Sequence, residues 1–127
     1  MGASITTRPS RRFAWTAIDV AAILIFVVVG RRNHDEAASI SGVLGTAAPF
    51  LIALAVSWPL SRSVRTPFAR SAILTTWLCT VILGLALRRV VFGDGIATPF
   101  IIVATITLGV LIALGRALAK RLSRSRS

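Results

Sequence analysis

Four long apolar runs, separated by short polar connections, constrain this chain more than any other feature of its sequence. They cover residues 13–30, 40–60, 71–87 and 96–115. Each is close to the roughly 20 residues that an α-helix needs to cross about 30 Å of hydrocarbon. Membrane β-strands alternate in polarity, and these runs do not. Because a backbone in lipid must form its hydrogen bonds internally, the runs predict four transmembrane helices.

The composition fits a membrane domain better than a soluble one. Of 127 residues, 55% are hydrophobic and 15% are charged, whereas soluble domains carry about 25% charged residues. The net charge of +11 would suggest a nucleic-acid partner on a soluble protein. Here the basic residues lie at the ends of apolar runs, so we expect contact with the lipid bilayer and no nucleic acid. We predict one integral membrane domain, residues 1–127, that forms an all-α four-helix bundle with a basic tail at 116–127.

The distribution of basic residues predicts the orientation. The side with both termini and the second connection carries eleven basic and no acidic residues, and the other side carries four basic residues. The eleven are Arg8, Arg11, Arg12, Arg62, Arg65, Arg70, Arg116, Lys120, Arg121, Arg124 and Arg126, and the four are Arg31, Arg32, Arg88 and Arg89. Under the positive-inside rule, both termini are cytoplasmic. We expect a multi-pass protein of a bacterial cytoplasmic membrane, with anionic lipid headgroups at its cytoplasmic face.

The two halves of the chain resemble each other. Each has one span that ends in an arginine pair and a second span near a Gly-x-x-x-Pro-Phe motif, at residues 45–50 and 95–100. Because each half has two spans, the halves share one orientation. The pattern predicts two similar helical hairpins in a parallel repeat, related by an axis along the membrane normal.

The proline of each motif has two interpretations. A proline inside a helix loses one hydrogen bond and presses on the carbonyl four residues earlier, which belongs to Gly45 for Pro49 and to Gly95 for Pro99. A glycine there accommodates a kink. Alternatively, the prolines lie in the first turns of their helices, where proline is harmless. We favour a kink at Pro49, whereas for Pro99 the first-turn interpretation is at least as good.

Asp19 is the only acidic residue inside an apolar run. A carboxylate at that depth is costly in lipid, so the protein must satisfy it or use it. A structural Asp19 would accept hydrogen bonds from Thr16, from Trp15 or from a snorkelling Arg12. A functional Asp19 would be an intramembrane acid that binds a proton or a cation. In both cases we expect Asp19 to point into the bundle or toward a subunit interface.

A candidate polar cluster on the predicted outer side combines the residues that follow the first span with the arginine pair that follows the third. Its candidate residues are Arg31, Arg32, His34, Asp35, Glu36, Arg88 and Arg89. Three consecutive metal-capable residues rarely converge on one ion, so we predict no metal site. We expect residues 33–36 to cap the next helix and to pair with the arginines. A further alternative is that the arginine pairs bind an anion or a lipid phosphate.

Tryptophans and small residues predict how the helices contact lipid and each other. Trp15, Trp58 and Trp77 fall near the cytoplasmic ends of spans, where tryptophans are typical interfacial anchors. Small residues at four-residue spacing allow helices to approach closely in lipid. One such stripe in the third span contains Thr76, Thr80 and Gly84. These stripes predict a tightly packed bundle and indicate no chemistry.

The sequence contains no known set of catalytic residues and no phosphate-binding loop, so we predict a non-enzymatic protein without cofactor. Our first hypothesis is a component of an envelope or transport assembly, in contact with other membrane proteins. The second is a small dimeric proton- or cation-coupled transporter that uses Asp19. A third, weaker hypothesis is anionic-lipid binding by the outer arginine pairs.

Several residues together resemble a known family. These are Asp19, Phe26, the stretch Gly30-Arg31-Arg32-Asn33-His34-Asp35-Glu36, Pro49-Phe50 and Trp58-Pro59. The chain resembles domain of unknown function 3054, small membrane proteins found mainly in actinobacteria. This resemblance implies the four-span topology and adds no mechanism. Small multidrug-resistance transporters share only the layout of four helices and an early acidic residue, which is Glu in that family.

Overall fold

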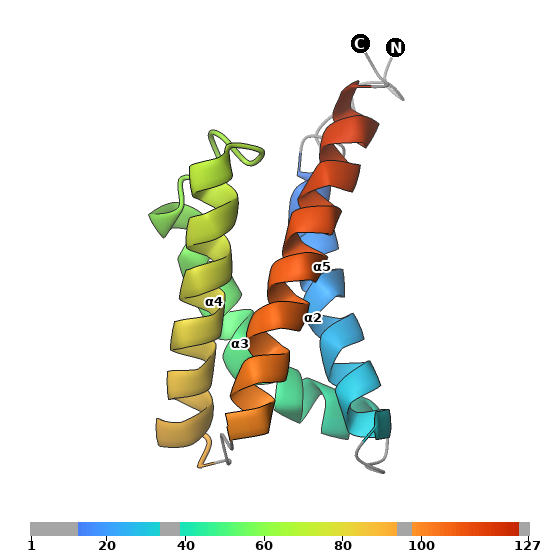
Figure 1. Cartoon of the computed structure of the whole chain (residues 1–127), viewed down its shortest axis with the longest axis vertical. Coiled ribbons are helices and arrows are strands. Elements are labelled where there is room, and N and C mark those ends of the chain that lie inside the picture. The colour runs from blue at the N-terminus through green and yellow to red at the C-terminus, as the bar shows by residue number, and fades with distance from the viewer. Residues whose placement is uncertain (1–12, 34–38, 94–97, 125–127) are drawn as a thin grey trace.

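The fold is a bundle of four long α-helices. The computed structural model describes residues 13–33, 39–93 and 98–124. Its helices are α2 (Ala14–Asn33), α3 (Ile40–Leu60), α4 (Arg70–Val90) and α5 (Thr98–Arg124) (Figure 1). All four are long and apolar enough to cross a membrane. The prediction of an all-α, multi-pass membrane protein is confirmed.

Three helices extend beyond the apolar runs that predicted them, whereas α3 begins and ends where its run does. The predicted first and third runs stop before the arginine pairs, but α2 continues to Asn33 and α4 to Val90. Both arginine pairs therefore lie in the last turns of helices. The fourth run stops at residue 115, but α5 continues to Arg124. Arg116 is consequently a residue of the helix and not the beginning of a separate tail.

The helices pack in a ring. Among the described residues α3 packs most extensively on α4 and α2 on α5, while the α2–α3 and α4–α5 interfaces are smaller, and the backbones of the two diagonal pairs do not approach closely. A two-fold axis that relates the α2–α3 hairpin to the α4–α5 hairpin would produce this pairing. The ring centroids of Phe50 and Phe100 lie 6.3 Å apart, so the two Pro-Phe motifs meet at one level of the bundle. Both observations agree with the predicted parallel repeat.

The bundle has two distinct ends. The first turn of α2, the connection 61–69 and the last turns of α5 lie at one end, here called the loop end (Figure 1). The last turns of α2 and α4 and the first turns of α3 and α5 lie at the other end, here called the aromatic end. Between this end and the middle of the bundle, the rings of Phe26, Phe50 and Phe100 pack against one another, with centroid distances of 5.8–6.3 Å.

Two local motifs define where α3 begins and ends. At its start, the Ser39 hydroxyl accepts a hydrogen bond from the Gly42 amide at 3.1 Å. The side chains of residues 33–36, from which a cap was expected, lie outside the described part of the chain, and the observed cap is the serine directly before the helix. At its end, Arg62 adopts a left-handed conformation with φ of 59°. The amides of Arg62 and Ser63 bond back to the carbonyls of Pro59 and Trp58, which is the Schellman arrangement.

Close packing between α3 and α4 depends on small residues. Thr76, Thr80 and Gly84 form a buried stripe on α4, as the sequence predicts. A Cβ atom added at Gly84 would lie only 2.5 Å from the Phe50 ring, so the glycine admits that ring. Lipid provides no hydrophobic force to join helices, and close van der Waals packing supplies the attraction instead.

The kink candidates occupy different environments. Pro49 is buried in the interior of α3, and the space beside Gly45 is open. Pro99 is the second residue of α5, which agrees with the first-turn interpretation. Gly95 lies outside the described residues.

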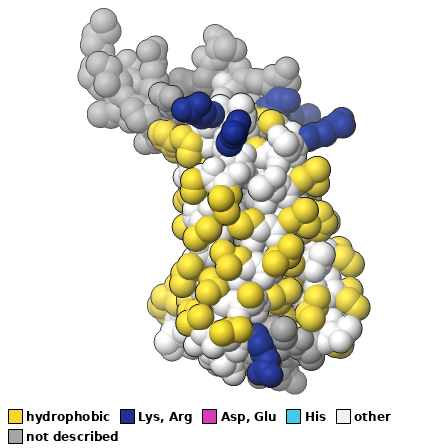
Figure 2. Space-filling view, turned by 90° about the vertical axis from the view of Figure 1, so that its left-hand side faces the viewer, with side chains coloured by type: hydrophobic (Ala, Val, Ile, Leu, Met, Phe, Trp, Pro, Cys, Tyr) yellow, Lys and Arg dark blue, Asp and Glu magenta, His cyan; other side chains and the backbone are white. Residues whose placement is uncertain are grey.

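The surface separates charge from apolar groups. Apolar side chains cover the middle of the bundle, and arginine and lysine side chains gather toward the ends (Figure 2). All four helices expose large aliphatic side chains in their middle turns, including Ile25, Ile52, Ile82 and Ile106. This band is the surface that a membrane-spanning bundle presents to lipid.

Candidate functional site: a buried carboxylate–arginine pair

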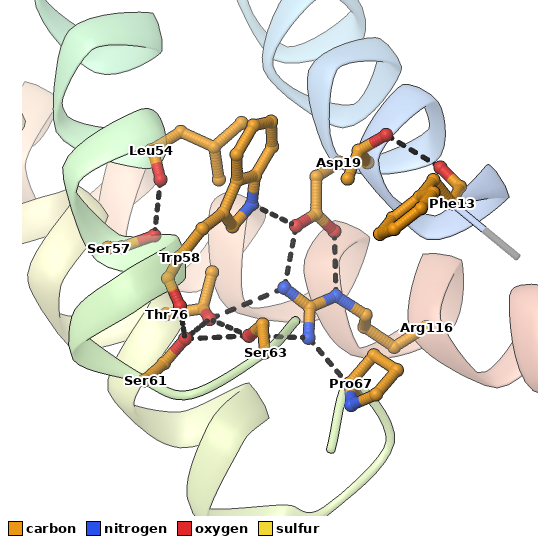
Figure 3. A network of polar contacts seen from close by, with 11 residues as sticks. Phe13, Asp19, Leu54, Ser57, Trp58, Ser61, Ser63, Pro67, Thr76 and Arg116 are labelled. Carbon is orange, nitrogen blue, oxygen red and sulfur yellow. Dashed lines mark hydrogen bonds and ion pairs between the residues drawn. The ribbon is translucent and has the colours of Figure 1, made fainter. Parts of the chain in front are cut away.

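An ion pair between the first and last helices lies in the interior of the loop end. Asp19 of α2 and Arg116 of α5 are both fully buried. Arg116 Nε donates to Asp19 Oδ1 at 2.9 Å, and Arg116 Nη2 donates to Asp19 Oδ2 at 2.6 Å (Figure 3). This two-pronged geometry is the strongest form of a charge-assisted hydrogen bond in proteins. It cancels two charges that would each be costly inside the membrane.

The remaining donors of Arg116 bind the connection 61–69 and α4. Arg116 Nη1 donates to the Pro67 carbonyl at 2.7 Å and to the Ser63 hydroxyl at 3.2 Å. Arg116 Nη2 also donates to the Thr76 hydroxyl at 3.3 Å. A guanidinium has five N–H groups, and all five have an acceptor here. Arg116 therefore ties α5 to α2, to α4 and to the connection between α3 and α4.

Two tryptophans complete the surroundings of the pair. Trp58 of α3 donates its indole N–H to Asp19 Oδ2 at 3.0 Å. The guanidinium of Arg116 lies over the Trp15 ring, 4.7 Å from its centroid, and the two indoles meet edge to face. The prediction of an interfacial anchor is wrong for Trp15, because its ring is buried against the Arg116 guanidinium. Trp58 is half-buried, and its N–H serves the interior ion pair.

Three neighbouring hydroxyl groups form hydrogen bonds with one another, and two of them accept hydrogen bonds from Arg116. The Ser63 hydroxyl lies 2.6 Å from that of Ser61 and 3.2 Å from that of Thr76. Ser61 in turn bonds to the Trp58 carbonyl at 3.2 Å. The Schellman motif at the end of α3 positions these serines. It reverses the direction of the chain after Ser61, so that the Ser63 hydroxyl lies next to Arg116. One turn along α4, the buried Thr80 hydroxyl has no hydrogen-bond partner within the described part of the chain.

The structure places Asp19 in the bundle interior, where the sequence predicts it, but with other partners. The expected donors were Thr16, Trp15 or Arg12. Thr16 instead donates to the Phe13 carbonyl at 2.6 Å, and Trp15 stacks on Arg116. Arg12 lies outside the described residues. The real partner was missed because Arg116 follows an apolar run that was expected to end at residue 115, and so it was counted among the exposed residues of the tail.

The described residues of the outer polar cluster do not form one site. Arg31 donates to the Thr46 hydroxyl at 2.9 Å, and the Arg88 guanidinium lies over the Phe100 ring, 4.6 Å from its centroid. Each arginine thus contacts the helix that follows it in its own hairpin, while Arg89 is exposed. The predicted members His34, Asp35 and Glu36, and the Arg32 side chain, lie outside the described residues. Within the described residues, no group of metal-ligating side chains gathers.

These features define the class of the protein: a multi-pass membrane protein whose bundle is closed at one end by an interior arginine–carboxylate pair. The chain belongs to the family described as Protein of unknown function (DUF3054), which it matches over residues 16–119. The matched segment includes both Asp19 and Arg116. The resemblance seen in the sequence is thereby confirmed. No curated protein matches the chain, and no solved structure matches it.

Proposed function

We propose that this protein is a non-enzymatic component of a larger membrane assembly, in the cell envelope or in transport. The observation that carries the proposal is the saturation of the Asp19–Arg116 pair. Asp19 accepts three hydrogen bonds, and every N–H group of Arg116 has an acceptor inside the protein. A site that binds or converts a substrate keeps polar groups free for that substrate. The pair instead uses its bonds to join the helices.

The proposed role requires partners along the membrane-facing surface. Each of the four helices exposes large apolar side chains, so neighbouring helices of other proteins can pack on any of them. A rigid bundle with a fixed interior is suited to present such faces in a constant geometry. This supports an assembly component over a protein that moves a solute through its own centre.

Native co-purification tests the proposal. A tagged chain is extracted from its own membranes with a mild detergent, and its companions are identified after brief cross-linking. We expect one or a few membrane proteins at constant ratio to the tagged chain. Recovery of the chain alone, at several expression levels and in two detergents, would contradict the assembly role.

One observation favours a second candidate, a proton- or cation-coupled transporter. Asp19 is fully buried in a span, and ionisable residues at such positions often mark ion pathways. In this candidate, a proton or cation replaces Arg116 at the carboxylate during a transport cycle. The outer arginine pairs favour no third candidate, since Arg31 and Arg88 already contact their own hairpins.

Flux measurements separate the two candidates. Purified protein in sealed vesicles with an internal pH dye reports proton movement after an imposed gradient. The assembly role predicts a proton flux equal to the leak of vesicles without protein. The transporter predicts a faster flux that Asp19→Asn abolishes, with Lys120→Gln as the matched control on an exposed residue.

A further inference from the structure

Five basic side chains surround the loop end of the bundle. Arg62 and Arg65 lie in the connection 61–69, Arg70 begins α4, and Lys120 and Arg121 lie near the end of α5. All five are exposed, and Figure 2 shows basic side chains gathered at one end of the molecule. These five residues are called the basic collar.

The fold brings the two parts of the basic collar together. Arg116 bonds to the Pro67 carbonyl, so α5 and the connection meet directly beneath the collar. Lys120 is one turn beyond Arg116 on α5. The collar is therefore built on a fixed framework and does not depend on the terminal residues of the chain.

In the described part of the chain, no acidic side chain neutralises the basic collar. The sequence contains four acidic residues. Asp19 is buried and held by Arg116. Asp35, Glu36 and Asp94 fall in the two connections whose flanking helix turns lie at the aromatic end. Within the described residues, none of the five collar side chains forms an ion pair.

The lengths of the helices place the collar near the expected depth of lipid headgroups. At 1.5 Å per residue, about 20 residues cross the hydrocarbon. Counted from Thr98, α5 crosses this distance near Leu118, so Lys120 and Arg121 follow just outside it. Arg70, at the start of α4, meets the same boundary from the other direction. Phosphate groups of phospholipids occupy this layer.

We propose that the basic collar selectively binds the headgroups of anionic phospholipids in the leaflet at the loop end. Five uncompensated cations at headgroup depth attract an anionic lipid more strongly than a zwitterionic one, and each exposed cation adds to the attraction. Arginine also matches phosphate with two parallel hydrogen bonds. The collar is a lipid-selective surface in addition to the proposed assembly role, and it acts whether or not a protein partner is present.

Lipid selectivity in reconstituted bilayers tests this proposal. Spin-labelled phosphatidylglycerol and phosphatidylcholine report how many lipids of each kind the protein immobilises. We expect phosphatidylglycerol to be preferred severalfold at low salt. The variant Arg65→Gln/Arg70→Gln/Lys120→Gln/Arg121→Gln should bring the ratio close to one. The double variant Lys120→Gln/Arg121→Gln should remove part of the preference, and it remains informative if the larger variant folds poorly.

Controls distinguish the collar from other sources of selectivity. Arg89→Gln removes a single exposed arginine at the aromatic end and should lower the preference much less than the collar double variant does. Salt at 1 M shortens the screening length to about 3 Å and should suppress the preference. Equal immobilisation of both lipids by the unaltered protein would overturn the proposal. So would a preference that the collar variants leave intact, or one that millimolar inorganic phosphate eliminates at constant ionic strength.

Discussion

The two ends of the bundle are held together by different physics. At the loop end, one arginine joins three helices and a connection through directional hydrogen bonds, and each bond needs a particular partner atom. At the aromatic end, Phe26, Phe50 and Phe100 fill space between the helices, and Gly84 provides the room for one ring. Both devices answer the same problem, because lipid gives helices no hydrophobic reason to associate.

The comparison teaches how each end should respond to change. A directional network fails when one member is lost, since the others keep their polar groups without partners. A packed cluster responds to volume, and it tolerates a change in chemistry if the shape is kept. The polar end should therefore be sensitive to single deletions, and the aromatic end to single additions of atoms.

The largest expected effect follows from Arg116→Met at the loop end. It leaves the Asp19 carboxylate buried without its counter-ion, and breaking a buried pair in this way costs about 3–5 kcal/mol. Reversible unfolding in mixed micelles, followed by circular dichroism, measures the loss. Lys120→Met, one turn further and exposed, should change stability by less than about 0.5 kcal/mol.

The double variant Asp19→Leu/Arg116→Met sharpens this result. Removing both charges leaves no unpaired ion, so it should cost less than Arg116→Met alone. A double variant as unstable as the sum of the two single variants would contradict the structural role of the pair.

The next effect compares two indole donors with different acceptors. Trp58 donates to the charged Asp19 carboxylate at 3.0 Å, and Trp77 donates to the neutral Thr105 carbonyl at 2.8 Å. Trp58→Phe should cost about 1.5–3 kcal/mol and Trp77→Phe about 0.5–1.5 kcal/mol. Both substitutions lose the same atoms, so the difference in unfolding free energy reports the charge of the acceptor together with the different packing of the two rings. Equal losses would show that the hydrogen bond from Trp58 to the charged Asp19 carboxylate stabilises the fold no more than a hydrogen bond to a neutral carbonyl.

Much of the fold follows from the sequence because the membrane requires it. An apolar run of sufficient length in lipid must form a helix. The four spans could therefore be predicted from the apolar run at 40–60 and the three other apolar runs alone. The inward position of Asp19 follows from the same cost of exposing charge to lipid. The helix ends were harder to predict, because the helices that contain Arg88 and Arg116 continue beyond the ends of their apolar runs.

The partners of Asp19 could not be predicted from sequence for a physical reason. Arg116 lies 97 residues away, and pairing over such a separation is decided by how the helices pack. Local spacing suggested Thr16 and Trp15, which are near in sequence and were the wrong donors. One signal was present: an arginine directly after Gly115 had no acidic neighbour, and the only intramembrane acid lay at the same end of the bundle.

At the aromatic end, the test is an added methyl group. A Cβ at Gly84 would lie 2.5 Å from the Phe50 ring, so Gly84→Ala should cost about 1–3 kcal/mol by overpacking. Gly45→Ala is the matched control on α3, where no neighbouring atom lies within 4 Å of the new Cβ. It should leave stability equal or slightly higher, since alanine favours a helix. Phe50→Leu in the Gly84→Ala background should recover part of the loss, because the smaller side chain leaves room for the added methyl group. No recovery would show that the loss in Gly84→Ala does not come from a clash with the Phe50 ring.

The smallest expected effect concerns the backbone where α3 and α4 end. Arg62 at the loop end and Gly93 at the aromatic end both have positive φ, of 59° and 68°. Glycine adopts this conformation freely, and a residue with a Cβ does so at a cost. Arg62→Gly should therefore raise the unfolding free energy by up to about 1 kcal/mol, after the greater freedom of glycine in the unfolded chain is offset. Gly93→Ala should lower it by a similar amount. Arg62→Gln removes the charge and keeps the Cβ, so it should leave stability near that of the unaltered protein. If Arg62→Gln stabilised the protein as much as Arg62→Gly, repulsion within the basic collar would be the cause, and the backbone explanation would fail.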